Sequence, residues 1–367
     1  MMKQVSSKEH ISASGEAAIR RTAERHGNRP RRTDLFIFGL FVLLLAFILF
    51  SLTLGRYPVP VLQILHVILT TPLRARFNYT DVYRVVVEIV RLPRVLVVVL
   101  CGMGLALSGA AMQGVFRNPL VSPDIAGVSA GASFGGVLAI MLSLSQTGMV
   151  SLAFLFGLIA LVAAFSLARL AARSGILGLV LSGVIVGAFF GALVGLGQYV
   201  ADPQTKLPSI IYWLLGSFVG ATYQKLAIVA GVMLFAGTLL MMLRWRINLL
   251  SLGDVDAATL GINIEVLRWG IVGLVALIVA AQVSVSGGVG WVGLIIPHVA
   301  RMIVGPEHTK LLPASAFLGG IYLLAMDDIA RSVGSQEIPI GLLTAVIGAP
   351  IFAVLFWKLQ GKGWAHE

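Results

Sequence analysis

The sequence has 367 residues, of which 58% are hydrophobic and 12% are charged, and its formal net charge is +11. This composition lies far outside that of soluble domains and excludes an ordinary soluble enzyme or binding module. The single cysteine, Cys101, excludes an intrachain disulfide framework and a CxxC-type metal site. We therefore predict an all-α membrane protein, a polytopic helix bundle.

The first 33 residues are predicted to form a basic, disordered N-terminal tail. Its arginines are Arg20, Arg21, Arg25, Arg29, Arg31 and Arg32. Positive charge beside a first membrane helix holds the preceding chain in the cytoplasm, so the charge indicates topology rather than binding of nucleic acid. Residues 34–360 are predicted to form the membrane domain, and residues 361–367 a short C-terminal tail.

About ten segments between these tails have the roughly 20 apolar residues that a membrane-spanning helix needs. They are Leu35–Leu54, Pro93–Phe116, Ile125–Leu144, Met149–Ala172, Ile176–Val200, Lys225–Leu243, Leu267–Val285, Val289–Val304, Leu311–Ala330 and Ile338–Trp357. An even number of spans places both termini on one side of the membrane. We expect that side to be the cytoplasm, because most connections there contain Arg or Lys.

The connection 55–91 departs from this charge rule, because Arg74, Arg76 and Arg84 would lie on the outer side. One interpretation is a basic surface that receives acidic side chains of a partner. The other is that the connection is translocated whatever its charge. The sequence leaves both open.

A polar stretch at 244–266 interrupts the apolar pattern. Gly253 breaks it, Asp254 can cap a short helix that runs to Leu260, Gly261 can close that helix in a left-handed conformation, and Asn263 can cap the next helix. This short element carries several apolar side chains, more than a solvated loop needs. It either docks on a soluble partner or lies on the lipid headgroups.

Four glycines in the fifth segment are spaced four residues apart and share one helix face: Gly183, Gly187, Gly191 and Gly195. Small residues at this spacing let helix backbones approach closely in lipid. The stripe serves either packing within one subunit or a central pathway and dimer seam.

The sequence Gly127–Gly131 matches the G-x-S-x-G pattern of hydrolases around Ser129. That pattern requires a strand, a sharp turn and a helix, whereas the flanks here are predicted to be membrane helix, so a hydrolase is disfavoured. No G-x-x-x-x-G-K-[ST] phosphate loop is present in the sequence. If ATP drives this protein, another polypeptide binds it.

Ionisable residues inside predicted spans raise functional hypotheses by default. His298 lies near a helix end and is expected to make a structural hydrogen bond rather than to bind a metal. Asp327 and Asp328 have Arg331 one turn away, so an intrahelical ion pair is favoured over a proton relay.

Four blocks of the sequence, at Arg91–Ser133, Leu252–Asn263, Gly287–Gly305 and Glu337–Phe352, resemble the FecCD-type permeases of bacterial ABC importers. That family takes up iron-siderophore complexes, haem and cobalamin. The resemblance covers essentially the whole chain after residue 33. The sequence VSPD replaces the more common ADP of the family, which is a mild departure.

The resemblance implies a bundle of ten transmembrane helices with short cytoplasmic coupling helices. It also implies a homodimer in membrane lipid, two ATPase subunits on the cytoplasmic side and a periplasmic substrate-binding protein. ATP and Mg²⁺ would be bound by the ATPase, and this chain would bind no cofactor, no metal and no nucleic acid. The protein would be a multi-pass protein of the bacterial inner membrane with both termini in the cytoplasm.

The resemblance also assigns roles to individual residues. The coupling element that enters the ATPase would contain Leu249, Leu250, Leu252, Gly253, Asp254, Ala257, Leu260 and Gly261. The cytoplasmic gate would contain Ser174 and Gly175, and the four-glycine stripe of the fifth segment would line the pathway and dimer seam. The residues that dock the binding protein would be Arg74, Arg76 and Arg331.

The expected function is that of the permease subunit of an ATP-driven importer, not an enzyme, with haem as the first substrate expectation. An iron-siderophore complex comes next and cobalamin last, and no residue separates them. An ion-coupled secondary transporter is the alternative from a different class. Such a carrier would be expected to show an inverted repeat and ionisable residues near the membrane midplane. The sequence shows no obvious repeat, and it has no central carboxylate outside the ninth segment.

Overall fold

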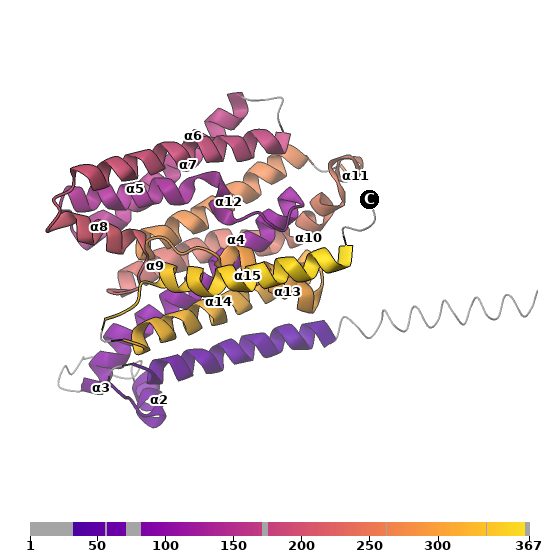
Figure 1. Cartoon of the computed structure of the whole chain (residues 1–367). Coiled ribbons are helices and arrows are strands. Elements are labelled where there is room, and N and C mark those ends of the chain that lie inside the picture. Colours follow the sequence, from indigo (N-terminus) through magenta and orange to yellow (C-terminus); the bar gives the residue numbers. More distant parts are fainter. Residues whose placement is uncertain are drawn as a thin grey trace, which may run out of the picture.

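Long helices run between two ends of the molecule in the computed structural model, one end carrying α2, α3 and α8 and the other carrying α11 (Figure 1). The structure describes residues 32–55, 57–70, 82–170, 175–261, 263–334 and 336–363. No strand occurs in these ranges, so the all-α prediction is confirmed.

The chain begins, within the described residues, with the helix Arg32–Thr53. The elements that follow are α2 Val61–Thr70, α3 Val82–Arg84, η2 Val85–Arg91, α4 Leu92–Phe116, η3 Pro123–Ala126, α5 Val128–Met141, α6 Gln146–Leu170, α7 Gly175–Val200, α8 Lys206–Leu214, α9 Tyr223–Val232, η4 Met233–Gly237, α10 Thr238–Leu252, α11 Asp254–Thr259, α12 Ile264–Ser286, α13 Val292–Val304, α14 His308–Ser332 and α15 Ile340–Gly363.

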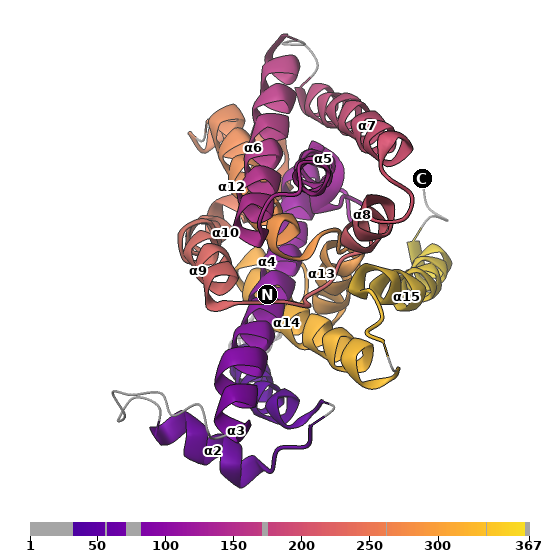
Figure 2. The ribbon, with the colours of Figure 1, turned by 90° about the vertical axis from the view of Figure 1, so that its left-hand side faces the viewer.

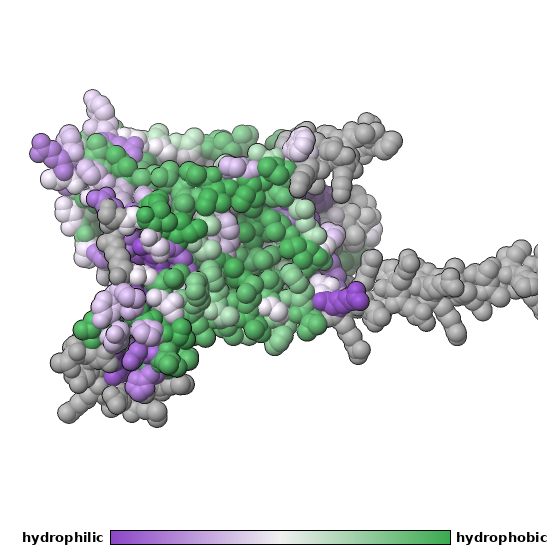
Figure 3. All heavy atoms as spheres, turned by 60° about the horizontal axis from the view of Figure 1, so that its bottom comes forward, coloured by the Kyte–Doolittle hydropathy of each residue, from purple (hydrophilic) through white to green (hydrophobic). Residues whose placement is uncertain are grey.

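Seven helices in the described ranges are long and apolar enough to cross a membrane, and α5, α13 and the apolar part of α15 are shorter. Every one of the ten predicted segments overlaps one of these helices. Apolar side chains cover the middle of the face shown in Figure 3, and hydrophilic ones lie mainly toward the ends. This distribution is typical of a bundle whose middle lies in hydrocarbon.

Two predicted boundaries were wrong, and both helices are longer than expected. The second span begins at Val82 rather than Pro93, since α3, η2 and α4 are continuous, and Arg84 therefore lies on a helix. The sixth span continues through the polar stretch as far as Leu252. That stretch contains no Gly or Pro before Gly253, and its Ile247 is fully buried, so tertiary packing outweighs its polarity.

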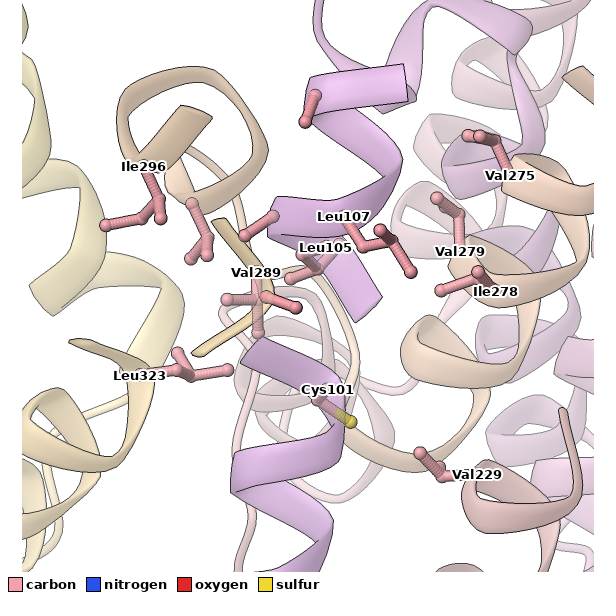
Figure 4. Close-up of a cluster of buried hydrophobic side chains, with 14 of the residues drawn as sticks. Cys101, Leu105, Leu107, Val229, Val275, Ile278, Val279, Val289, Ile296 and Leu323 are labelled. Atoms are coloured by element: carbon pink, nitrogen blue, oxygen red, sulfur yellow. The ribbon is translucent and has the colours of Figure 1, made fainter. Parts of the chain in front are cut away.

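Helix α4 lies at the centre of the bundle, with 83% of its most apolar stretch buried. Leu105 and Leu107 of α4 lie between Val289 on one side and Ile278 and Val279 of α12 on the other (Figure 4). All five side chains are at most 5% exposed. The apolar core is therefore organised around α4.

Glycine allows α4 to approach α14 at backbone distance. A Cβ built on Gly102 would lie 2.3 Å from the carbonyl oxygen of Gly319, and a Cβ on Gly319 would lie 2.4 Å from that of Gly102. A similar crossing joins α4 to α13, where a Cβ on Gly109 would lie 1.8 Å from the oxygen of Gly293. Each obstacle is main chain, which cannot rotate away.

We predict that Gly102→Ala destabilises the protein by about 3 kcal/mol, because the added methyl group must push α4 and α14 apart. The matched control is Gly231→Ala on α9, where no atom lies within 4 Å of the added Cβ. Melting temperatures of the two variants in the same detergent test this. Equal melting temperatures would contradict the proposed close crossing.

Candidate functional site

From Gly253 onward, the polar stretch folds much as the sequence predicts. Gly253 (φ 130°) separates α10 from the short helix α11, and Gly261 (φ 76°) follows α11 in the left-handed region. Asn263 begins α12, and its side-chain oxygen accepts a hydrogen bond from the amide of Val266 at 3.1 Å. The stretch is thus a compact turn–helix–turn element at one end of the bundle (Figure 1).

Asp254, the first residue of α11, ties this element to two other helices. Its carboxylate accepts a hydrogen bond from Arg117 at 2.8 Å and another from Arg268 at 3.2 Å. Arg117 terminates α4 in a left-handed conformation (φ 50°), and Arg268 belongs to α12. A displacement of α11 would therefore pull on α4, the most buried helix of the bundle.

The predicted coupling residues divide into two groups. Leu250 and Ala257 are 1% and 0% exposed, so they pack within this subunit and cannot offer apolar surface to a partner in this conformation. Their place in the coupling element stays a prediction, in which they would hold the element from inside. Leu260 is 59% exposed and Gly261 is also exposed, while Leu249, Gly253 and Asp254 are partly exposed. The side chain of Leu252 lies outside the described ones.

The glycines of the α7 stripe lie in two different surroundings. Gly183 is buried, and a Cβ on Gly127, which precedes α5, would lie 2.7 Å from its carbonyl oxygen. Gly191 and Gly195 are exposed, and nothing lies within 4 Å of a Cβ placed on either. The first half of the stripe thus packs within the subunit and the second half is uncovered, with Gly187 between them.

Two other groups of predicted residues fall wholly or partly outside the described residues. Ser174 of the predicted gate lies outside them, whereas Gly175 is the first residue of α7. Arg74 and Arg76 also lie outside them.

A glycine junction forms where α8, the connection from α12 to α13, and the start of α15 meet. It consists of Gly216, Gly287, Gly288 and Gly341. A Cβ on Gly216 would lie 2.2 Å from the oxygen of Gly288, and a Cβ on Gly341 would lie 2.5 Å from the same oxygen. Backbone bonds close the junction, including Ser217 N–H to Ser286 O at 2.7 Å.

A cavity of about 400 Å³ adjoins this junction. Its wall includes Asp124, Ser129, Trp291 and the backbone around Gly288. Trp291 has φ 70°, a conformation that is strained for a bulky residue. Non-helical backbone within an apolar bundle is tolerated where it is buried in protein or lines a cavity, as at the sites of many transporters. The cavity is therefore a candidate site for a small polar molecule.

Ser129 does not form a hydrolase site. It lies in α5 directly after the 3₁₀ helix η3, so the required strand is absent from its flank. Its hydroxyl donates a short hydrogen bond to Asp124, and no histidine lines the cavity as described. The serine instead helps to fix the start of α5.

At the end opposite α11, a buried ionic network joins four parts of the chain. Arg94 of α4 contacts Asp327 of α14 at 2.9 Å and Glu337, just before α15, at 2.7 Å. Ser51 of the first described helix donates to Asp328 at 2.7 Å. Asp328 is also paired with Arg331. The network fixes the relative positions of these helices.

Arg331 is buried in this network, with its side chain 7% exposed. Besides Asp328, it donates to the carbonyl oxygens of Ser51 and Leu54 at 2.6 and 3.1 Å. A role of Arg331 in docking the binding protein stays a prediction, and it would require these bonds to open. They agree with the alternative of an intrahelical ion pair.

Sequence reasoning missed Arg94. The residue lies in the first of the four blocks, but nothing along the chain indicates that it lies opposite Asp327, which is 233 positions away. For His298, Nε2 is buried and has no hydrogen-bond partner among the described residues. The expected structural hydrogen bond is therefore not seen at that atom.

The sequence matches the FecCD transport family over residues 43–358. The chain belongs to the FecCD transport family. The molybdate import system permease protein MolB of Haemophilus influenzae is 44% identical to it over 335 residues, which are 91% of this chain and 99% of MolB. The hemin transport system permease protein HmuU of Yersinia pestis is 37% identical over 276 residues, 73% of this chain and 82% of HmuU.

A solved structure described as an inward-facing conformation of a metal-chelate type ABC transporter is also similar. It has a TM-score of 0.79 and 42% identity, and the match covers 89% of this chain and 99% of that one. Other FecCD relatives are named for iron chelatin and for cobalamin. This FecCD chain is therefore the permease subunit of an ABC importer, a multi-pass membrane protein rather than an enzyme, and the ion-coupled carrier is set aside.

We predict that Arg94→Met in this permease lowers stability by about 3–5 kcal/mol, because it leaves the buried Asp327 carboxylate without its main partner. The control is Lys310→Met, which removes a more exposed pair with Glu307 at 3.6 Å and should cost about 0–1 kcal/mol. Thermal unfolding followed by tryptophan fluorescence tests both variants. If both variants have the same melting temperature, the network contributes no stability beyond that of a surface pair.

Proposed function

We propose that this FecCD permease works as a homodimer, with two ATPase subunits bound at the α11 end and a binding protein at the opposite end. The α11 end and both termini would face the cytoplasm. ATP and Mg²⁺ would bind to the ATPases, and this chain would need no cofactor. The arrangement of α11 carries the proposal, since Asp254 connects this short helix at the end of the bundle to α4 and α12.

The uncovered half of α7 supports a dimer seam or central pathway. Gly191 and Gly195 are exposed, and Tyr199, one turn beyond Gly195 on the same face, is 87% exposed. Such a strip of small and aromatic residues suits close packing with a second helix in lipid. Part of the strip would line the route by which substrate passes between subunits.

For the substrate, we propose a molybdate-like oxyanion as the first candidate and an iron chelate such as haem as the second. MolB is matched at higher identity, and over more of both chains, than HmuU. Haem, the expectation from the sequence, therefore has no specific support and moves to second place. Substrate choice in such importers also depends on the binding protein.

Reconstitution in liposomes tests the substrate proposal. The permease would be purified with the ATPase and binding protein encoded beside it, and ATP hydrolysis and uptake would be measured with molybdate, haem or neither. We expect molybdate to stimulate hydrolysis and to accumulate only when both partners are present. Stimulation by haem alone would reverse the order, and uptake of either without an ATPase would contradict the proposed coupling.

We predict that Asp254→Arg abolishes transport while the protein still inserts and dimerises, because the introduced charge repels Arg117 and Arg268 and frees α11. The remaining ATP hydrolysis should no longer respond to substrate. Glu265→Arg is the control, since it makes the same charge change on the exposed start of α12, outside α11. Substrate-stimulated transport at the wild-type rate in Asp254→Arg would rule out the coupling role.

A further inference from the structure

A second cavity, of about 540 Å³, lies at the end of the bundle opposite α11. Its wall is built from the end of α5, the start of α6, α8, the start of α9 and the end of α12. Figure 2 views the molecule from this end, with α5, α6, α8 and α9 around the region. No lining residue is shared with the cavity at the glycine junction. The two cavities are separate features of the subunit.

Lys225 supplies a buried positive charge to this cavity. It lies in the first turn of α9 and is only 4% exposed, yet its side chain lines the cavity. Its backbone amide is bonded to the Thr222 hydroxyl. Within the described part of the chain, its ammonium group has no carboxylate or hydrogen-bond acceptor.

The other buried cations at this end of the molecule all have partners. Arg84 pairs with Glu88 at 3.0 Å, and Arg331 pairs with Asp328. Arg91 donates to the carbonyl oxygen of Leu52 at 2.7 Å. Lys225 is therefore the exception among the described buried lysines and arginines. Burying an ammonium group without a partner is costly, so a counter-ion from outside the chain would stabilise it.

The remaining polar groups of the cavity are suited to an anion. The hydroxyls of Tyr212 and Ser217 lie 3.1 Å apart and share one hydrogen bond, which leaves one hydroxyl hydrogen to donate elsewhere. Gln146 and Ser209 add an amide and a further hydroxyl. None of the described lining residues is acidic. An oxyanion with several acceptor oxygens satisfies both the charge and the donors.

We propose that this cavity is an anion-binding site that takes a phosphate-type oxyanion against Lys225. The volume admits either a hydrated free oxyanion or the phosphate of a lipid headgroup with its neighbouring carbons, since pockets of about 300–1,000 Å³ hold small molecules. The site goes beyond transport and does not depend on which substrate the importer carries.

The experiment has two arms, one for each source of the phosphate. In the first, the full-length protein in neutral detergent is titrated with inorganic phosphate at constant ionic strength, and its melting temperature is followed, because a ligand of the folded state stabilises it in proportion to its occupancy. In the second, the protein is assembled into nanodiscs of phosphatidylcholine with or without phosphatidylglycerol, and bound lipid is counted by native mass spectrometry.

Four variants accompany the wild type in both arms. Lys225→Met removes the charge at similar volume, and we expect roughly ten- to hundredfold weaker binding. Lys225→Arg keeps the charge and should retain most of the binding. Tyr212→Phe removes only an exposed hydroxyl, so it tests the site even if Lys225→Met fails to fold. Lys206→Met is the control, since this nearby lysine already donates to the carbonyl oxygen of Met141.

Saturable stabilisation by free phosphate that is lost in Lys225→Met and weakened in Tyr212→Phe supports the proposal and identifies a soluble oxyanion. Retained phosphatidylglycerol with the same variant pattern also supports it and identifies a headgroup. Equal behaviour of wild type, Lys225→Met and Tyr212→Phe in both arms overturns it. So does an equal loss in Lys206→Met.

Discussion

The backbone crossings of α4 with α14 and α13 hold the bundle together around one central helix. In lipid, apolar side chains gain little by leaving one apolar environment for another, so helix association relies on close packing and polar contacts. Gly102, Gly319, Gly109 and Gly293 provide that close packing, because any side chain at these positions would collide with main chain. Their small size brings α4 to the centre of the bundle.

Ionic contacts at both ends of α4 follow from this central position. At one end Arg94 holds Asp327 and Glu337, and at the other Arg117 holds Asp254 of α11. The first group is largely buried and fixes helices relative to one another. The second is roughly half exposed and can be displaced at low cost. A rigid helix with one fixed end and one yielding end is suited to transmitting movement of α11 into the bundle.

Irregular backbone at the glycine junction is compensated by hydrogen bonds. The glycine junction breaks the helices next to a cavity, and its polar groups are satisfied by bonds such as Ile340 N–H to Gly216 O at 2.9 Å. Lys225 shows the opposite case, a buried charge that the described part of the chain does not satisfy. The cavities at these two sites are two places where the described interior could meet a small polar molecule, whereas the exposed half of α7 offers an apolar surface.

Three features were predictable from the sequence alone: the all-α membrane class, the positions of the ten apolar segments, and the turns around α11. Those features depend on local properties, namely apolar length, glycine and capping residues, and these act over one or two helical turns. The four-block resemblance likewise led to the FecCD family. The sequence did not reveal that helix continues from Arg244 to Leu252, because packing of Ile247 and Leu250 outweighed the local polarity.

Which polar residues meet depends on how distant helices pack against one another. Arg94 and Asp327 are 233 positions apart, and Lys225 lines its cavity with residues from α6 and α8, so no spacing along the chain predicts either arrangement. The same limit explains Arg331, whose sequence position suggested docking although its side chain points into the bundle. It also explains the α7 stripe, because identical glycines are buried or exposed according to the neighbouring helix. Contacts between distant segments are set by the packing of whole helices.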